Sequence, residues 1–327
     1  MKVSGRASQT VLTALAGLAA SAALATAATI TGTDSGDRLI GSPDADVIDA
    51  RGGDDRVHAK RGDDIVTGGL GRDRLFGNRG TDTISGGEER DVIVGGHGND
   101  HLIGEQGRDR LFGNDGDDIV RGGQGGDLIV GNGGNDTLTG DAPELGDPVS
   151  RDRIFAGRGN DTVNGGDGRD RLHGGDDDDM LSGNGERDLM SGGRGNDSQY
   201  GGAGDDVIAA NQGEDQTFGG DGDDILFAKA QGDVARGSND EVDTIGDTVH
   251  GEGGDDRIHT RDGEVDQVDC GTGEDVARLD LVDVISDATT ANPNGSCEKV
   301  IRRAPKPGED ASENATESPA EDSRQHD

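Results

Sequence analysis

Along the first half of this chain a large aliphatic side chain recurs every nine residues, and an aspartate stands two positions before it. The aliphatic residues of this run are Leu39, Ile48, Val57, Val66, Leu75, Ile84, Ile93, Leu102, Leu111, Val120, Ile129 and Leu138. Glycine fills most second and fourth positions of each unit, where a tight turn needs a positive φ or leaves no room for a Cβ. The pattern predicts a loop over the first six residues of each unit and a short strand over the last three.

Twelve such units, from Gly32 to Thr139, predict an all-β fold in which the chain winds into stacked coils. One short strand cannot bury a core, but two units form an 18-residue coil, and stacking places every aliphatic residue in one interior column. The register shifts by seven residues over 140–146, which we expect to form a surface loop, and it returns from Asp152 to Asp233. The 22 units up to Arg236 predict a parallel β-roll of 11 coils, about 50 Å long.

Two units carry the repeat in its fullest form. They are Gly95-Gly96-His97-Gly98-Asn99-Asp100-His101-Leu102-Ile103 and Gly165-Gly166-Asp167-Gly168-Arg169-Asp170-Arg171-Leu172-His173. Their shared pattern resembles the motif of the hemolysin-type (RTX) calcium-binding family. The resemblance implies that Ca²⁺ lies between loops of adjacent coils, held by the aspartate carboxylates and by main-chain carbonyls of the glycine-rich loop. Such hard oxygen ligands favour Ca²⁺ over Zn²⁺ or copper.

The resemblance assigns the ligand role to the sixth residue of most units, and multiple Ca²⁺ ions are the expected cofactor. The expected metal ligands are Asp55, Asp64, Asp73, Asp82, Asp91, Asp100, Asp109, Asp118, Asp127, Asp136, Asp161, Asp170, Asp179, Asp188, Asp197, Asp206, Asp215 and Asp224. The alternative is that these aspartates only form turns, as aspartate commonly does in glycine-rich loops. A turn alone would accept Asn or Ser at the same position, so the repeated Asp favours metal binding.

The composition has a formal net charge of −37 on 327 residues and only 2% aromatic residues. A chain with this much self-repulsion and so little apolar surface is typical of disorder unless cations neutralise it. We therefore predict that the mature chain is largely unfolded without Ca²⁺ and becomes β-rich when the ions bind. The same charge disfavours nucleic acid and anionic lipid as partners.

Both ends of the chain differ from the repeats. Residues 1–27 have the charged start, apolar run and Ala-x-Ala sites of a secretory signal peptide, so we expect an extracellular protein without a membrane anchor after cleavage. Residues 28–236 are expected to form the roll, 237–303 degenerate repeats and a C-terminal cap, and 304–327 a disordered acidic tail. Cys270 and Cys297, the only cysteines, predict one disulfide in an exported chain. This segment resembles the end cap of related exported actinobacterial proteins.

The two faces of the predicted roll differ. One face carries Arg beside Phe, most clearly Arg74 with Phe76 and Arg110 with Phe112. A duplication of two coils can account for part of this stripe, since isolated exposed apolar residues are common. The other interpretation is a docking face for a cell-surface partner or for a second roll.

On the opposite face the aliphatic column is interrupted at Gln199, Thr217 and Ala235. Tyr200 and Phe218 directly follow the first two of these positions. Either the register slips by one residue so that the aromatic rings turn inward, or the core is weak there. The least regular coils are therefore expected between about 195 and 250.

The sequence contains no evident catalytic constellation. His97 and His101 are four residues apart, but Gly98 replaces the glutamate of a zinc-protease motif, and the segment belongs to the repeat rather than to a helix. No Gly-x-Ser-x-Gly elbow occurs, and Cys270 has no evident catalytic partner. We expect a non-enzymatic, exported calcium-binding scaffold. The alternative is a calcium-dependent adhesin or surface-layer-associated protein that uses the Arg and Phe face.

Overall fold

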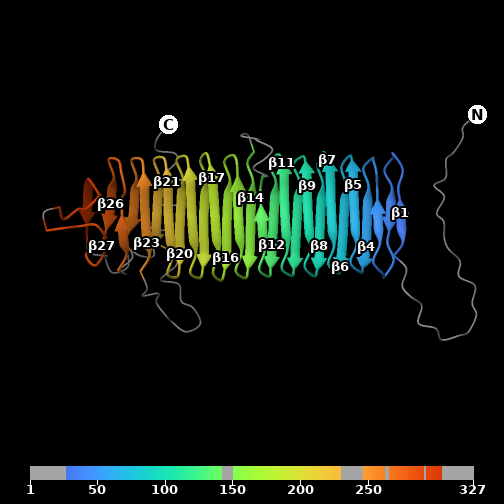
Figure 1. Ribbon diagram of the computed structural model, residues 1–327, viewed down its shortest axis with the longest axis horizontal. Helices are drawn as coiled ribbons and strands as arrows, with labels where there is room; N and C mark the ends of the chain where they lie inside the picture. Colours follow the sequence, from blue (N-terminus) through green and yellow to red (C-terminus); the bar gives the residue numbers. More distant parts are fainter. Residues whose placement is uncertain (1–26, 142–149, 230–245, 262–264, 291, 304–327) are drawn as a thin grey trace, which may run out of the picture.

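The computed structural model describes residues 27–141, 150–229, 246–261, 265–290 and 292–303. All regular elements in these ranges are β-strands, which wind into one elongated roll with its coils across the long axis (Figure 1). The predicted parallel β-roll is confirmed. No helix in these ranges is long and apolar enough to span a lipid bilayer. The predicted signal peptide except its last residue, the acidic tail, Asp233 and Ala235 lie outside the described residues.

The strands alternate between two parallel sheets of 14 strands each. The odd sheet contains β1 (Thr29–Thr31), β3 (Val47–Asp49), β5 (Ile65–Leu70), β7 (Thr83–Glu88), β9 (His101–Gln106), β11 (Ile119–Gln124), β13 (Thr137–Thr139), β15 (Thr162–Gly166), β17 (Met180–Gly185), β19 (Ser198–Ala203), β21 (Gln216–Asp221), β23 (Thr248–Gly253), β25 (Gln267–Asp269) and β27 (Val284–Ile285). The even sheet contains β2 (Arg38–Ile40), β4 (Arg56–Arg61), β6 (Arg74–Arg79), β8 (Val92–His97), β10 (Arg110–Asp115), β12 (Leu128–Gly133), β14 (Arg153–Arg158), β16 (Arg171–Asp176), β18 (Leu189–Arg194), β20 (Val207–Gln212), β22 (Ile225–Lys229), β24 (Arg257–Thr260), β26 (Val276–Leu279) and β28 (Lys299–Arg302). At about 4.8 Å per strand, the roll is about 60 Å long.

The strands are longer than the repeat pattern suggested. A typical strand has six residues and runs from the seventh position of one unit to the third position of the next, so only three residues remain for the turn. In β6 the segment after Gly77 stays in the ladder because Asn78 and Arg79 pair with Gly96 and His97 of the next coil, although Asn78 has a φ of +78°. The expectation of a six-residue loop was wrong, since hydrogen bonds between coils hold these residues in the sheet despite their glycine content.

The aliphatic column forms the core. Residues 18 apart pair across neighbouring strands of one sheet, as Leu75 does with Ile93 and Leu111 with Ile129. From Ile48 to Leu172 the eighth-position side chains are no more than 2% exposed, so both sheets turn this column inward.

The interruption of the column at Gln199 and Thr217 leaves the register intact. Gln199 pairs with Thr217 in the strand ladder, both side chains are buried, and Tyr200 and Phe218 remain on the outer surface. Thr217 Oγ1 lies 3.3 Å from Gln199 Oε1, and Gln199 Nε2 donates to the carbonyl of Ala209 at 3.1 Å. The aromatic rings therefore do not turn inward, and the polar side chains satisfy each other within the core.

Two segments before β23 depart from the eighteen-residue step. Gly140 and Asp141 keep the first two positions of their unit, since Gly140 N–H donates to Asn164 O at 2.9 Å, so the insertion begins after Asp141 and not at Gly140 as expected. Further along, Gln216 pairs with Thr248 and Ile225 with Arg257, which places β21 beside β23 and β22 beside β24. The step along the chain is therefore 32 residues here instead of 18.

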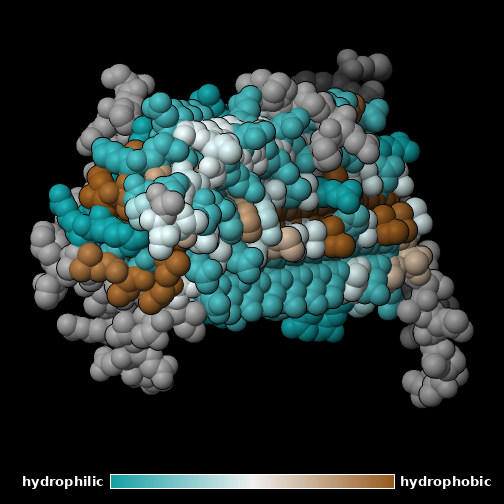
Figure 2. Space-filling view, turned by 60° about the vertical axis from the view of Figure 1, so that its left-hand side comes forward, coloured by the Kyte–Doolittle hydropathy of each residue, from teal (hydrophilic) through white to brown (hydrophobic). Residues whose placement is uncertain are grey.

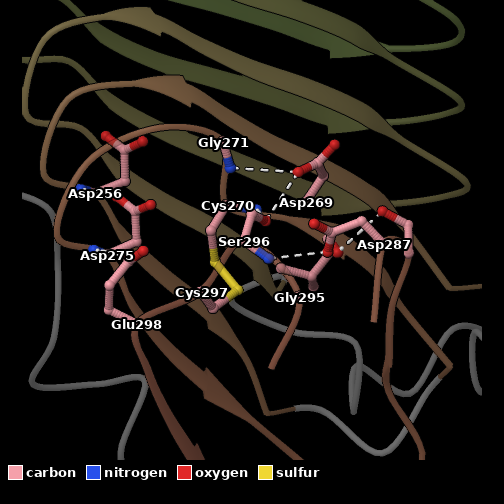
Figure 3. Close-up of a disulfide and its surroundings, with 12 residues drawn as sticks. Asp256, Asp269, Cys270, Gly271, Asp275, Asp287, Gly295, Ser296, Cys297 and Glu298 are labelled. Atoms are coloured by element: carbon pink, nitrogen blue, oxygen red, sulfur yellow. Dashed lines mark hydrogen bonds between the residues drawn. A yellow bond between two sulfur atoms is a disulfide. The ribbon is translucent and has the colours of Figure 1, made fainter. Parts of the chain in front are cut away.

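The C-terminal end of the roll is closed by a disulfide and by hydrogen bonds of the Ser296 hydroxyl. The predicted bond between Cys270 and Cys297 is confirmed, with a Cα–Cα distance of 5.1 Å (Figure 3). It closes a loop of 27 residues, which corresponds to about 3.5 kcal/mol of stabilisation in a chain-entropy estimate. Ser296 Oγ accepts from Cys270 N–H at 2.9 Å and donates to Asp269 Oδ1 at 3.0 Å, which ties the last loop to β25.

Candidate calcium-binding turns

Each three-residue turn ends at the repeat aspartate, whose carboxylate reaches across the gap to the preceding coil. Asp73 N–H donates to Asp91 Oδ1 at 2.8 Å, and Asp91 N–H donates to Asp109 Oδ1 at 2.8 Å. The carbonyl of each aspartate accepts from the seventh residue one coil later, as Asp73 O does from Val92 N–H at 3.0 Å. Every aspartate is thus bonded to the coil on either side, which fixes its side chain between two turns.

These bonds form two carboxylate ladders, one on each edge of the roll. The ladder in the turns that follow odd strands contains Asp37, Asp55, Asp73, Asp91, Asp109, Asp127, Asp152, Asp170, Asp188, Asp206, Asp224, Asp256 and Asp275. The ladder in the turns that follow even strands contains Asp46, Asp64, Asp82, Asp100, Asp118, Asp136, Asp161, Asp179, Asp197, Asp215, Asp247, Asp266 and Asp283. All 18 predicted ligands therefore lie in these two rows.

The second carboxylate oxygen, Oδ2, has no hydrogen-bond partner in most interior turns although it is fully buried. This holds for Asp55, Asp64, Asp73, Asp82, Asp91, Asp100, Asp109, Asp118, Asp127, Asp136, Asp161, Asp170, Asp179, Asp188, Asp197, Asp206 and Asp224. Asp215, the remaining predicted ligand, joins its ladder through Oδ1, which accepts from Asp197 N–H at 2.7 Å. A buried carboxylate oxygen without a donor is strongly unfavourable, so these atoms need a cation or a proton.

Sequence analysis missed two further members of this set, Asp256 and Asp275, whose Oδ2 atoms are also buried without a partner. Asp256 follows a glycine-rich stretch from Gly251 to Gly254, so the signal was present but stood out of step with the main run. Asp280 has a buried Oδ2 of the same kind outside the repeat pattern, and no sequence signal indicated it.

The turns of Asp37 and Asp283, at opposite ends of the roll, differ because the chain itself satisfies Oδ2 there. Asp37 Oδ2 accepts from Thr33 N–H at 2.6 Å and from Thr33 Oγ1 at 2.9 Å. Asp283 Oδ2 accepts from Thr260 Oγ1 at 2.6 Å and from Asp280 N–H at 2.7 Å. In the other ladder Asp275 N–H donates to Glu298 Oε2 at 2.8 Å, which ends that row beside the disulfide (Figure 3).

Stacking buried carboxylates in a row has a large electrostatic consequence. Two unit charges about 4.8 Å apart repel by about 3.5 kcal/mol at an effective dielectric constant of about 20. Burial, and then the charges of neighbouring carboxylates, raise the pKa of Asp152 and of Asp188 to about 9. The same causes raise the pKa values of Asp91, Asp197 and Asp224 to about 8. Without cations, neutral pH therefore cannot ionise both ladders in the folded roll.

Main-chain carbonyls supply the other oxygen atoms in the space between the turns of neighbouring coils. At the fourth position Gly98 has a φ of +116°, and a Cβ there would lie 2.1 Å from the carbonyl oxygen of Gly80 in the preceding coil. The carbonyls of the turns thus point along the axis toward the next turn, and only glycine leaves that space open. No three His, Cys, Asp or Glu side chains converge on one point in the described residues. A cation there would take most of its six to eight oxygen ligands from carbonyls, which suits Ca²⁺ and not Zn²⁺.

The comparison with protein families agrees with this geometry. A model of the RTX calcium-binding nonapeptide repeat, built as four copies, matches residues 31–66, 58–93, 76–111, 94–129, 112–142, 150–181, 164–199, 182–217, 191–226, 200–235 and 246–264. A search among curated proteins gave no match. The matched repeats span more than half of the sequence, and all aspartates of the two rows except Asp266, Asp275 and Asp283 lie within them. The chain therefore belongs to the family of RTX calcium-binding nonapeptide-repeat proteins.

Proposed function

We propose that this protein is an exported, non-catalytic scaffold that folds when multiple Ca²⁺ ions bind between its turns. One observation carries the proposal: the interior aspartates present buried Oδ2 atoms without a hydrogen-bond donor, at the same place in coil after coil. A bound Ca²⁺ would supply the positive charge that these oxygens lack. Each ion would then link the carboxylate of one coil to carbonyl oxygens of that coil and its neighbour.

The arrangement of each aspartate carboxylate explains why a cation is required. Oδ1 of each aspartate accepts from a backbone N–H of the preceding coil, so the carboxylate has one fixed orientation in the folded roll. Oδ2 then faces the interior near the first residue of its own unit, where a Cβ on Gly104 would lie 2.5 Å from Asp109 Oδ2. Neutralising these charges removes repulsion along a whole row, so binding of one ion favours the next.

Coupling of folding to calcium would make export directional, because the chain would be unfolded inside the cell and folded outside it. A chain that stays unfolded at the low calcium level inside a cell and folds outside, where calcium is about millimolar, would pass a secretion channel as a flexible polymer. This part of the proposal depends on the predicted signal peptide, residues 1–27.

Far-UV circular dichroism of the mature chain tests the coupling. We expect a spectrum of an unfolded chain in excess EGTA at neutral pH and a β-rich spectrum in about millimolar Ca²⁺. Magnesium is the matched control, because Mg²⁺ requires a small octahedral site and releases its waters reluctantly. A chain that is equally β-rich in EGTA, or that responds equally to Mg²⁺, would contradict the proposal.

The alternative function is a calcium-dependent adhesin or surface-layer-associated protein that uses the face carrying Arg74, Phe76, Arg110 and Phe112. All four residues lie on the even sheet, and the ring of His58 stacks on Phe76 with centroids 4.7 Å apart. The guanidinium of Arg56 lies 5.6 Å from the Phe76 ring centroid. Retention of the protein on the cell surface, compared between wild type and a variant with both Phe residues changed to Ser, tests this role.

A further inference from the structure

The outer surfaces of the two sheets carry different charge. At the seventh position, which faces outward, the even sheet has Arg38, Arg56, Arg74, Arg110, Arg153 and Arg171. The corresponding positions of the odd sheet include Val47, Ile65, Thr83, Ile119, Thr137 and Thr162. On a chain with a net charge of −37, the cations are therefore concentrated on one face.

A second row of arginines lies in the turns that lead into the even sheet. Its members are Arg72, Arg90, Arg108, Arg151, Arg169 and Arg187, and all six are exposed. Arg72 pairs with Asp54 at 2.9 Å and Arg169 approaches Glu186 at 3.7 Å. Within the described residues the other four have no carboxylate within ion-pair distance. Most turns of the opposite edge have Asp or Asn at this position, such as Asn99 and Asp117, where Asn99 Oδ1 accepts from Asp117 N–H at 3.0 Å.

A groove runs along the even sheet beside these rows. Its lining includes Phe76 and Val94 near one end and Val130, Phe155 and His173 farther along, and both stretches include Asp115. The longer stretch has a volume of about 820 Å³ and continues to Asn211 and Gln212 of β20. Figure 2 shows apolar side chains that gather in a band along the roll between hydrophilic rows.

The far rim of the groove is also basic. Arg79, Arg158 and Arg194 lie there at the third position. The two acidic residues that line the groove are both engaged: His97 Nδ1 lies 2.6 Å from Asp115 Oδ2, and Asp176 lies 3.3 Å from Arg194 and 3.9 Å from Arg158. Amide side chains such as Asn78 and Asn132 stand between rim and floor.

We propose that this groove binds an extended acidic polysaccharide along the axis of the roll. Arginine forks on both rims would hold carboxylates of the polymer, and the amides and rings between them suit sugar hydroxyls and the apolar faces of sugar rings. The coils repeat the same chemistry at every step, which matches a polymer with a repeating unit. Duplex DNA fits less well, because one charge per about 1.7 Å would be strongly repelled by the acidic remainder of the molecule. The inference rests on the proposed function, since calcium must first fold the roll and neutralise the carboxylate rows.

The test measures binding of a short oligogalacturonate to the full mature chain in about millimolar Ca²⁺, by calorimetry. We expect the wild type to bind the oligogalacturonate and not a neutral oligosaccharide of equal length. The variant Arg74→Gln with Arg110→Gln should weaken binding by about tenfold or more, because it removes two charge-assisted contacts. The matched control, Arg51→Gln with Arg121→Gln, removes the same charge from β11 and from the segment after β3, and it should change affinity by less than about twofold.

Several outcomes would overturn the inference. Equal losses in the two double variants would indicate attraction by overall charge rather than by this groove. Tighter binding of duplex DNA than of oligogalacturonate, or loss of a dimer in the Arg74 and Arg110 variant without loss of sugar binding, would assign the face to another partner. Circular dichroism of each variant in Ca²⁺ separates the two proposals. A wild type that folds with calcium but binds no oligogalacturonate would refute only this inference, whereas one that fails to fold would refute the proposed function.

Discussion

Interior and terminal turns of the roll place the same aspartate in different surroundings. In an interior turn Asp109 Oδ1 accepts from Asp91 N–H at 2.8 Å, while Oδ2 is buried without a donor. At the N-terminal end Asp37 Oδ2 accepts two hydrogen bonds from Thr33, from N–H at 2.6 Å and from Oγ1 at 2.9 Å. At the C-terminal end Thr260 Oγ1 donates to Asp283 Oδ2 at 2.6 Å.

This difference shows where a cation is needed. A turn at the end of the roll has a neighbour on one side only, so a carbonyl cage between two turns is incomplete there, and at Asp37 and Asp283 a threonine hydroxyl takes its place. The insertion after Asp141 behaves similarly, because Ser150 Oγ lies 3.2 Å from Asp152 Oδ2. We infer that the free Oδ2 atom, rather than the aspartate itself, marks a calcium-binding turn.

The largest effect expected from this comparison comes from removing interior charges. Asp109→Asn with Asp127→Asn keeps an oxygen to accept from the preceding coil but places an NH₂ group where each free carboxylate oxygen stood. We expect the calcium concentration at half-folding to rise by about tenfold or more, and the number of bound ions to fall. Calorimetry gives the number of ions, and circular dichroism gives the midpoint.

The matched control is Asp37→Asn at the N-terminal end. It should leave the number of ions unchanged and lower the free energy of unfolding by only about 1 kcal/mol, since it loses bonds from Thr33 that are already formed. If the terminal variant removed as many calcium ions as an interior one, the distinction between the two kinds of turn would be wrong.

The next effect is a pH dependence of the calcium-free chain. Burial raises the folded-state pKa of Asp91 to about 8 and of Asp188 to about 9, whereas an unfolded Asp has a pKa of about 3.9. The folded roll therefore binds more protons than the unfolded chain between about pH 4 and pH 9, and its stability falls as the pH rises through that window. Each unit of difference in pKa corresponds to about 1.4 kcal/mol.

Circular dichroism in a strong chelator should thus show more β-structure at pH 5 than at pH 8, because protons neutralise the ladders in place of calcium. With calcium present the direction reverses, since protons compete for the same carboxylates and the calcium midpoint rises in acid. A calcium-free chain that is equally unfolded at both pH values would mean that repulsion between interior carboxylates does not limit folding.

The sequence predicted the parts of this structure that depend on the period. The all-β roll, its aliphatic column and the disulfide between Cys270 and Cys297 follow from spacing and composition. The length of the strands did not, because glycine in the first three positions indicates a turn locally, and only hydrogen bonds to the neighbouring coils keep these residues in the sheet. The pairing of Ile225 with Arg257 was not foreseen, because Asp233 keeps the nine-residue step in the sequence.

The sequence predicted which aspartates form the candidate site. It did not predict that the two carboxylate oxygens of each aspartate have different surroundings. A list of aspartates does not reveal that Oδ1 is bonded to the preceding coil, nor that Thr33 satisfies Asp37 at one end. Those facts depend on which coil lies beside which, and on side chains outside the nine-residue pattern. The same is true of Gln199 and Thr217, whose mutual hydrogen bond required the stacked register.

The smallest effect concerns the polar pair Gln199 and Thr217 inside the core. It tests whether calcium binding depends on the free carboxylate oxygens or on any buried polar group. Thr217→Val keeps the shape of the side chain but leaves Gln199 Oε1 without its donor, so we expect a loss of about 1 to 2 kcal/mol in the free energy of unfolding in calcium. Adding Gln199→Leu should restore most of this loss, because removing both polar partners leaves nothing unsatisfied. The number of bound calcium ions should stay the same in both variants, as measured by calorimetry. If the single variant instead changed the number of ions, a polar group anywhere in the interior would affect calcium binding, and the special role of the free carboxylate oxygen would be lost.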